Sequence, residues 1–178
     1  MAKKKDKNAD LIEHYLTHES GMVHFFEDLL MIRDHDTAQL VEFELGKRKG
    51  QVVLHEVCEK QKRERGYVRV ILLKSRRFGG STYTEARYYF NTTMNENRNT
   101  FIIGHEDEST TTLFRMAKLF QARNPLQPTT LASNAKELRF DNKRGTGLKS
   151  EYRLATAGTK EAGRSQGIHY LHSSEEAF

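Results

Sequence analysis

The sequence predicts an α/β fold, with a mostly parallel central sheet and helices on both of its faces. Short runs of β-branched and aliphatic residues alternate along residues 67–123 with longer segments whose apolar positions follow helical spacing. Strands separated by helices of this length are joined by crossover connections, which make neighbouring strands parallel. A length of 178 residues suits a single domain of this kind.

The first residues of the chain, 1–9, are expected to form a flexible basic tail, because charged termini are usually solvated. Residues 10–178 then form the domain. Apolar residues at helical spacing predict two short helices at its start, one around residues 12–16 and one from Met22 to Leu30. Ser20 is the candidate N-cap of the second helix.

A third helix is predicted over residues 47–65, after a short extended segment at residues 40–45. Leu54 and Cys58 would lie on its apolar face, and Gly66 would end it. A buried strand is predicted next, because residues 70–73 form an unbroken apolar run. The remaining segments are predicted as a helix at 81–94, a strand at 101–104, a helix at 107–123, strands at 137–141 and 150–157, and a final strand at 168–172.

Composition limits the compartment and the partners. The net charge of +5 and the pI near 9.3 permit a polyanionic partner such as a nucleic acid or a nucleotide. Cys58 is alone, so it forms no internal disulfide, which fits a reducing compartment. No apolar run approaches the length of a membrane span, and no secretory signal segment is visible. We therefore expect a cytoplasmic protein that is not secreted and has no membrane partner.

The segment between the predicted strand at 67–73 and the helix at 81–94 has the residue types of a phosphate-binding loop. Gly79 and Gly80 allow a close backbone approach, and Ser81 offers a hydroxyl to Mg²⁺ at the helix start. Lys74 supplies a long cationic side chain from the other end of the loop. The alternative is an ordinary glycine turn with basic neighbours. The candidate nucleotide-contacting residues are Lys74, Ser75, Arg76, Arg77, Phe78, Gly79, Gly80, Ser81 and Thr82.

This loop departs from the usual G-x-x-x-x-G-K-[ST] pattern, since Gly80 takes the Lys position and Lys74 the first Gly position. It resembles instead the deviant Walker A motif of large terminase subunits, the ATPase motors that package DNA in tailed phages and herpesviruses. Their K-x-R-x-x-G-x-S pattern is matched by Lys74, Arg76, Gly79 and Ser81. Residues 101–123, 155–165 and 171–178 resemble, in order, the family's second strand-helix unit, its Gly-Arg loop and its Walker B strand end. The resemblance covers roughly residues 40–178.

The resemblance implies a three-layer P-loop NTPase of the additional-strand, catalytic-Glu type, with ATP and Mg²⁺ as cofactors. It implies that Glu175 is the general base and that Ser174 stands where many such ATPases carry the Mg²⁺-binding Asp. Together with Ser81, Ser174 is the candidate metal residue. Arg164 would be an arginine finger that reaches a neighbouring subunit; the alternative is an ordinary surface Arg. For Glu175 the alternative is a solvated acid at the end of the chain.

Gln51 is a further candidate, because the family places an adenine-reading Gln before the loop, although a polar position on the helix at 47–65 is the favoured explanation. His14 and His18 stand at i and i+4 on the first predicted helix. That spacing suits zinc, but we expect an ordinary surface pair, since Glu13 lies in the wrong place for an H-E-x-x-H motif.

The function implied by the resemblance is ATP-driven translocation of double-stranded DNA into a procapsid, in the cytoplasm of an infected cell. Its partners would be DNA, a portal protein and a small terminase subunit, in a homo-oligomeric ring on the procapsid and as a monomer in isolation. A final strand without its returning helix suggests a truncated ATPase domain, with the remaining ATPase segment and a nuclease domain absent. The alternatives are a nucleotide-binding module of a helicase-like protein and a non-catalytic DNA or protein interaction domain.

Overall fold

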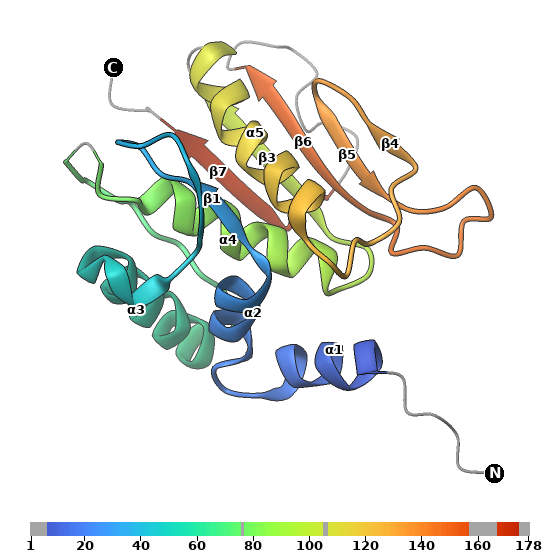
Figure 1. The fold of residues 1–178 in the computed structure, drawn as a ribbon, viewed down its shortest axis with the longest axis horizontal. Coiled ribbons are helices and arrows are strands. Elements are labelled where there is room, and N and C mark those ends of the chain that lie inside the picture. The colour runs from blue at the N-terminus through green and yellow to red at the C-terminus, as the bar shows by residue number, and fades with distance from the viewer. Residues whose placement is uncertain (1–6, 76, 105–106, 157–166, 175–178) are drawn as a thin grey trace.

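The computed structural model describes residues 7–75, 77–104, 107–156 and 167–174. Helices and strands follow one another along the chain as shown in Figure 1. In order they are α1 (Lys7–Thr17), α2 (Gly21–Leu29), β1 (Met31–Arg33), β2 (Leu40–Glu42), a 3₁₀ turn (Leu45–Lys47), α3 (Lys49–Arg65), α4 (Gly80–Thr93), β3 (Asn99–Gly104), α5 (Asp107–Arg123), β4 (Ala132–Ser133), β5 (Glu137–Phe140), β6 (Ser150–Thr156) and β7 (Tyr170–Ser174).

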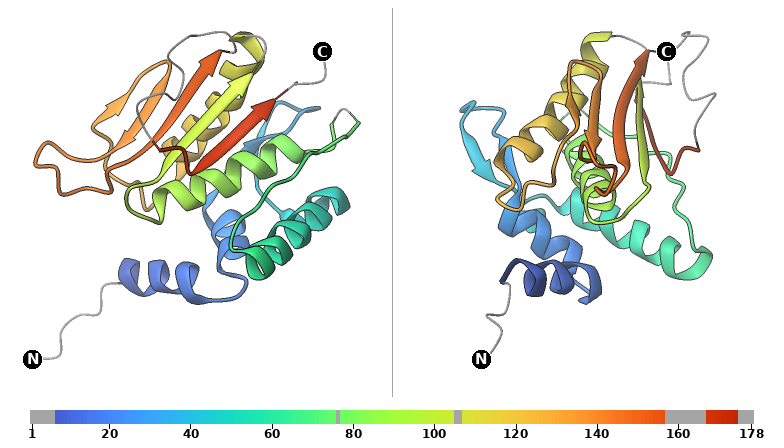
Figure 2. Two further views of the ribbon diagram at one scale, coloured as in Figure 1. Left: turned by 180° about the vertical axis from the view of Figure 1, so that it is seen from behind. Right: turned by 90° about the vertical axis from the view of Figure 1, so that its right-hand side faces the viewer.

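The main sheet has five strands in the order β4-β5-β6-β3-β7. β3 is parallel to both of its neighbours, β6 and β7, whereas β5 is antiparallel to both of its neighbours, β4 and β6. The expected α/β fold is confirmed, with a sheet that is mixed and parallel only at β6, β3 and β7. Figure 2 shows the sheet from behind and from the side.

Helices α4 and α5 pack on the same face of the sheet. Thr100 of β3 shares a hydrogen bond with Thr92 of α4. Gly104 lies on the same face of β3, because side chains alternate along a strand, and its backbone approaches Thr110 of α5. Tyr152 of β6 likewise contacts both helices. The described residues therefore form two layers, and the three-layer arrangement with helices on both faces differs from what they show.

Aromatic side chains fill the space between the sheet and the helices. Phe25 of α2 packs edge-on against Phe90 of α4, and Tyr89 of α4 packs against Phe120 of α5. Rings of this size contribute large apolar areas, so a chain with few aliphatic residues still builds a continuous core. The largest fully buried aromatic side chains are Tyr15, Tyr83, Tyr89, Tyr152, Phe25, Phe26, Phe43, Phe114, Phe120 and Phe140.

A small hairpin of β1 and β2 precedes α3, and only its second strand was anticipated from the sequence. Met31 pairs with Glu42 and Arg33 with Leu40. Asp34 closes the turn between the strands, since one of its carboxylate oxygens accepts hydrogen bonds from the backbone N–H groups of Asp36 and Thr37. An Asp at the first position of a turn is a recognised signal, and it identifies this hairpin in retrospect.

The strand predicted over residues 67–73 is wrong. This segment has irregular backbone outside the sheet, and Ile71 and Leu73 are almost fully exposed. The segment contacts helices instead of strands. The N–H of Arg69 donates to the side chain of Gln61 in α3, and Leu72 lies against Gly80 at the start of α4. An apolar run alone does not fix a strand, because a strand also needs a partner edge.

The helices predicted at 47–65, 81–94 and 107–123 are confirmed to within about two residues. Gly66 ends α3 with φ of +76°, the left-handed conformation expected of a terminating glycine. None of the helices in the described part of the chain has the length and apolar character needed to cross a membrane.

Candidate functional site

The predicted phosphate-binding loop ends in a tight bend, residues 77–80, whose last residue, Gly80, is the first residue of α4; we call this bend the glycine turn. Arg77 and Gly79 have positive φ values of +63° and +81°. Gly79 is the N-cap residue of α4 and has no side chain that can accept from the first N–H groups of the helix. These donors and the positive end of the helix dipole are the features that attract an anion.

Helix α3 holds the glycine turn in place. The side-chain amide of Gln51, which is buried, donates to the carbonyl oxygen of Gly79 at 2.7 Å. Arg48 donates to the carbonyl oxygen of Arg77 at 2.9 Å. The ring of Phe78 rests on Gly50 so closely that a Cβ atom there would overlap it. Residues 48–51 therefore determine the shape of the glycine turn through these contacts, although they are not part of it.

Lys74 and Leu72 lie over the first residue of α4. A Cβ atom on Gly80 would stand 2.6 Å from a methyl carbon of Leu72 and 3.3 Å from Cδ of Lys74. A side chain at position 80 would displace both, so the glycine allows the stem of Lys74 to lie beside the helix N-terminus. Lys74 is itself exposed, so its ammonium group can turn toward a ligand there.

The other predicted loop residues differ in their surroundings. Ser75 is exposed, and Ser81 and Thr82 are half-buried in the first turn of α4. The guanidinium of Arg77 lies 3.8 Å from the carboxylate of Asp36. Arg76 lies outside the described residues.

Gln51 has a clear structural role. Its amide nitrogen donates to the carbonyl oxygen of Gly79, so this side chain helps to shape the turn, a contact that the sequence did not predict. The base-reading role suggested by the resemblance is not needed to explain its burial.

The carboxyl end of β7 lies on the same side of the molecule as the glycine turn, as both Figure 1 and Figure 2 show. Ser174 is the last residue of β7 and is paired with Gly104 at the end of β3. The outer ends of parallel strands are where ligands of α/β proteins commonly bind. Glu175 and Arg164 lie outside the described residues, so this geometry places only Ser174 of the three.

A buried polar cluster connects α4 to the sheet. The carboxylate of Glu85, which has no exposed surface, accepts a hydrogen bond from the hydroxyl of Tyr152 in β6 and contacts Nδ1 of His172 in β7. Burial, together with the Glu85 carboxylate, raises the pKa of Tyr152 well above its usual range, so this hydroxyl stays protonated and donates. The cluster therefore joins α4, β6 and β7 about one helical turn after the glycine turn.

Tyr88 adds a second connection between α4 and β7. Its hydroxyl donates to the carbonyl oxygen of Leu171 at 2.9 Å. Burial, assisted by the charge of Glu85, raises the pKa of Tyr88 to about 12, so it also remains a donor. Sequence reasoning missed this group. The sequence offered only weak signals for it: Glu85 beside the apolar positions of a predicted helix, and Tyr152 and His172 within predicted strands.

Helices α3 and α4 are joined by a partly buried ion pair. Arg87 donates to the carboxylate of Glu59 at 2.5 Å and to the hydroxyl of Tyr83 at 3.1 Å. His55 shares a hydrogen bond with the same hydroxyl at 3.0 Å. Burial opposes the charge of Arg87, but Tyr83 and Glu59 outweigh it and raise the pKa of Arg87 above its usual value. This group keeps α3, and with it the glycine turn, in a fixed position on α4.

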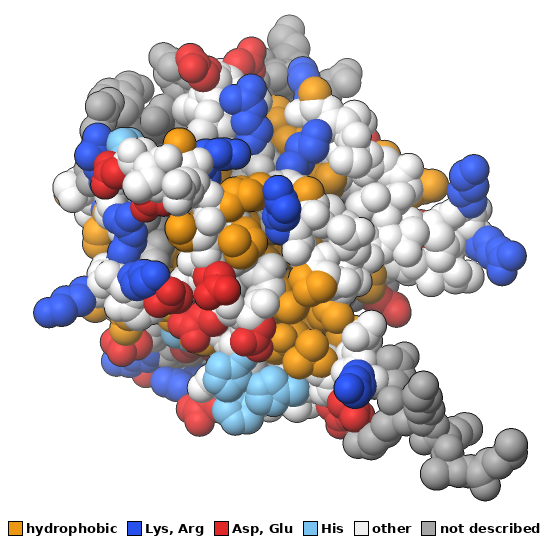
Figure 3. Space-filling model, in the orientation of Figure 1, with side chains coloured by type: hydrophobic (Ala, Val, Ile, Leu, Met, Phe, Trp, Pro, Cys, Tyr) orange, Lys and Arg blue, Asp and Glu red, His pale blue; other side chains and the backbone are white. Residues whose placement is uncertain are grey.

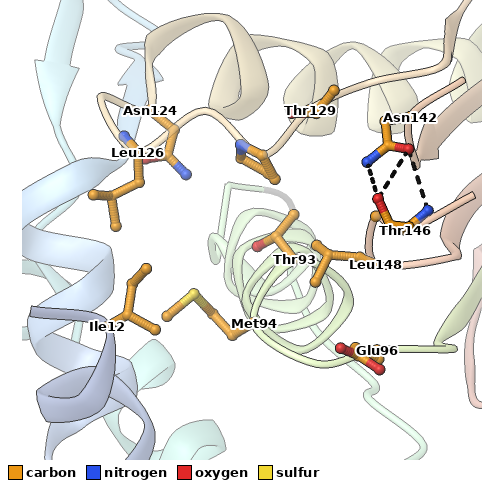
Figure 4. Close-up of a pocket in the computed structure, with 12 residues that line it drawn as sticks. Ile12, Thr93, Met94, Glu96, Asn124, Leu126, Thr129, Asn142, Thr146 and Leu148 are labelled. Carbon is orange, nitrogen blue, oxygen red and sulfur yellow. Dashed lines mark hydrogen bonds between the residues drawn. The ribbon is translucent and has the colours of Figure 1, made fainter. Parts of the chain in front are cut away.

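A pocket of about 370 Å³ lies at the opposite end of α4 from the glycine turn (Figure 4). Ile12, Met94 and Leu126 line one side of it, and the hydrogen-bonded pair Asn142 and Thr146 lines the other. Its lining combines apolar side chains with neutral polar groups and the single carboxylate of Glu96. This composition offers no nucleophile with a paired base, so the pocket does not compete with the glycine turn as a candidate catalytic site.

No model of a known protein family matches the sequence, and no curated protein matches it either. The class that the structure itself defines is an α/β domain with a mixed five-stranded sheet and a helical N-terminal region.

Proposed function

We propose that this chain is the ATP-binding and hydrolysing motor domain of a large terminase subunit, which powers movement of double-stranded DNA into a procapsid. The observation that carries the proposal is the glycine turn at the N-terminus of α4, with the stem of Lys74 beside Gly80. The match of Lys74, Arg76, Gly79 and Ser81 to the family's loop pattern supports it.

Each residue then has a defined task. The backbone N–H groups at the start of α4 bind the phosphates of ATP, and the Lys74 ammonium neutralises their charge. Ser81 and Ser174 would hold Mg²⁺, which would supply positive charge to the phosphates. Glu175 orients the attacking water, and Arg164 of an adjacent subunit stabilises charge on the transferred phosphoryl group.

The proposal includes the finer fold class, a P-loop NTPase of the additional-strand, catalytic-Glu type. In that class the segment before the loop is a strand of the sheet, whereas residues 67–73 are not a strand here. Support for the finer class therefore comes from the glycine turn, from α4 and from the parallel strands β6, β3 and β7. The proposed setting is the cytoplasm of an infected cell, with a portal protein and a small terminase subunit as partners of a ring on the procapsid.

Nucleotide affinity tests the proposal directly. The chain is titrated with a fluorescent ATP analogue and Mg²⁺, beside the variants Lys74→Ala and Lys143→Ala. Both lysines are exposed, so neither substitution should affect folding, and Lys143 lies in the turn before β6. We expect Lys74→Ala to weaken binding about tenfold or more, equivalent to ~1.4 kcal/mol, and Lys143→Ala to leave it unchanged. Equal affinities for all three proteins would remove Lys74 from the phosphate site.

A second experiment tests whether Arg164 of one subunit acts on the nucleotide bound to its neighbour. Arg164→Ala and Glu175→Gln proteins are assayed for ATP turnover separately and as a mixture. Because each variant would supply the residue that the other lacks, the mixture should recover activity. A mixture no more active than its components would contradict an arginine finger that acts between subunits.

A non-catalytic interaction domain is the second candidate function. The observation that favours it is the almost complete exposure of Ile71 and Leu73 directly before the glycine turn, since exposed apolar residues often mark contact with a partner. Failure of the wild-type chain to bind any triphosphate would support this candidate over the motor.

A further inference from the structure

Three histidines come together on the helical hairpin of α1 and α2. His14 and His18 lie one turn apart on or just after α1, and His24 faces them from α2. Their potential ligand atoms all lie within 4.8 Å of one another. Figure 3 shows the imidazoles as one continuous patch on the surface, so a dissolved ion can reach them. The sequence suggested only an unremarkable surface pair, because His24 belongs to the next helix.

The rings already face one another in a compact arrangement. The rings of His14 and His24 are stacked, with an interplanar angle of 3° and centroids 5.1 Å apart. Nε2 of His14 lies 2.8 Å from Nδ1 of His24, so the two nitrogens share one proton. In a tetrahedral metal site two ligand nitrogens stand about 3.3 Å apart, given bonds of about 2.0–2.1 Å. Binding an ion therefore widens the spacing of these two nitrogens by about half an ångström, and the donor ring then carries its proton on its other nitrogen.

The hairpin scaffold holds the histidines in register. Gly21 sits so close to α1 that a Cβ atom would lie 2.4 Å from the carbonyl oxygen of Tyr15. The hydroxyl of Tyr15, a buried residue, donates to the carboxylate of Asp28 at 3.1 Å. The same Tyr15 ring packs edge-on against Phe25. These contacts fix α1 against α2, so little ordering remains to be done when an ion binds.

Local charge favours a cation. Residues 8–30 contain no Lys or Arg, although the whole chain has a net charge of +5. The same stretch contains five carboxylates, at Asp10, Glu13, Glu19, Glu27 and Asp28. Figure 3 shows acidic side chains next to the imidazole patch. A positive ion is therefore attracted to this part of an otherwise basic protein.

One existing hydrogen bond opposes binding. The backbone N–H of Ser20 donates to Nδ1 of His18 at 3.1 Å. An ion held through either nitrogen of His18 breaks this bond, because Nδ1 either becomes the ligand or takes up the proton. The bond is exposed, so breaking it costs little compared with a metal–imidazole bond.

We propose that His14, His18 and His24 bind one divalent transition-metal ion, with Zn²⁺ as the best fit. Three neutral imidazoles suit Zn²⁺, Co²⁺, Ni²⁺ or Cu²⁺, whereas Mg²⁺ and Ca²⁺ require oxygen ligands. Zn²⁺ accepts a tetrahedral set of three imidazoles and one solvent molecule. The ion fastens α1 to α2 and is separate from the proposed nucleotide site on α4.

The test uses the untagged chain, freed of metal by a chelator and then titrated with Zn²⁺ at about pH 7.5, where imidazoles are neutral. Calorimetry should give one ion per chain with a Kd of about 1 µM or below. The His24→Asn variant should bind at least about tenfold more weakly, and the control His35→Asn, an exposed histidine in the β1–β2 turn, should match the wild type. Should His24→Asn not fold, His18→Asn removes an exposed ligand instead.

Two further readouts separate this site from binding by carboxylates or by the nucleotide site. Zn²⁺ should raise the Tm of the wild type and of His35→Asn but not of His24→Asn. Lowering the pH to about 5 should abolish binding, because protonated imidazoles cannot ligate, whereas a carboxylate site would persist. Absence of stoichiometric binding below about 100 µM, or equal binding by wild type, His24→Asn and His18→Asn, overturns the proposal.

Discussion

Single residues of the chain show how the same backbone conformation can have different consequences. Gly66 and Gly79 both have a left-handed backbone, with φ values of +76° and +81°. A Cβ atom on Gly66 would meet nothing within 4 Å, whereas one on Gly79 would stand 2.6 Å from the amide nitrogen of Gln51. The two glycines therefore separate the effect of backbone strain from the effect of losing the contact with α3.

The first prediction uses this pair. Gly66→Ala should destabilise the protein by about 1 kcal/mol, the strain of a left-handed alanine. Gly79→Ala should cost about 1 kcal/mol more, because the new methyl group also breaks the hydrogen bond from Gln51. Denaturant unfolding measures both differences. Equal losses of stability would contradict the anchoring role that we assign to Gln51.

His55 is expected to make the free energy of unfolding depend on pH. Burial lowers the pKa of His55 below its usual value of 6.5, Arg87 acts in the same direction, and Glu59 and Glu56 oppose them. Between the folded pKa and 6.5 the unfolded chain binds more protons than the folded one, so stability rises with pH in this window. The contribution is complete above 6.5 and is lost as the pH falls toward the folded pKa.

The second prediction follows from that sign. The free energy of unfolding of the wild type should fall between about pH 7 and pH 5, and His55→Gln should show a smaller fall, because Gln does not titrate. His35→Gln, which changes an exposed histidine, is the control and should follow the wild type. Identical pH profiles for His55→Gln and the wild type would show that His55 does not carry this dependence.

At the scale of secondary structure, residues 67–73 combine a strand-like sequence with an irregular structure. Leu72 lies against Gly80, whereas the next residue, Leu73, is 96% exposed. Adjacent leucines therefore make different contributions to stability, even though the sequence makes them look equivalent. Transfer of an apolar side chain from water stabilises only in proportion to the area that is buried.

The third prediction compares these leucines. Leu73→Ser should leave stability within about 0.5 kcal/mol of the wild type and should reduce self-association, since it removes an exposed apolar group. Leu72→Ser should destabilise by about 1–2 kcal/mol, because a partly buried contact with α4 is lost. Unfolding curves and light scattering over a range of concentrations check both variants. A large loss of stability in Leu73→Ser would show that the segment is buried in solution.

Elements with strong local signals were predictable from the sequence. Helix α3 has an apolar stripe and a terminating glycine, and α5 has acids in its first turn, Asp107 and Glu108. The strand order and the shared face of α4 and α5 were not predictable, because both depend on contacts between distant segments. The apolar run at 70–73 shows the same limit, since its sequence does not specify a partner edge.

At the scale of the whole molecule, β3 is an interior strand of the sheet and its most deeply buried parallel strand. It pairs with β6 on one side and β7 on the other, and Thr100 and Ile102 have no exposed surface. The β1–β2 hairpin has three residues in each strand and lies outside the five-stranded sheet. Local opening of the hairpin therefore needs far less energy than opening of the sheet.

The fourth prediction is a gradient of amide hydrogen exchange. Peptides that cover β3 should exchange slowest, at a rate close to that of global unfolding, and peptides that cover β1 and β2 should exchange fastest among the strands. Exchange followed by mass spectrometry measures this order. Slower exchange in the hairpin than in β3 would contradict the sheet order.

The candidate sites were predictable to different extents, and for a physical reason. The loop from Lys74 to Thr82 is contiguous, so its glycines and cation are visible in the sequence. The groups that hold it come from elsewhere, because Gln51 lies in α3 and Arg48 directly before this helix. The buried polar cluster is even less local, since Glu85 and His172 are 87 positions apart. The histidine cluster likewise needs the turn between α1 and α2 before His24 reaches His14.

The attachment of the glycine turn to α3 has a mechanical consequence. Gln51 and Arg48 bind the turn at one end of a helix of 17 residues, which is about 25 Å long. A ligand that displaced the turn would pull on the first residues of α3, while His55 and Glu59 hold the middle of the same helix on α4. The strain of such a displacement would therefore fall on the helix segment between Gln51 and His55.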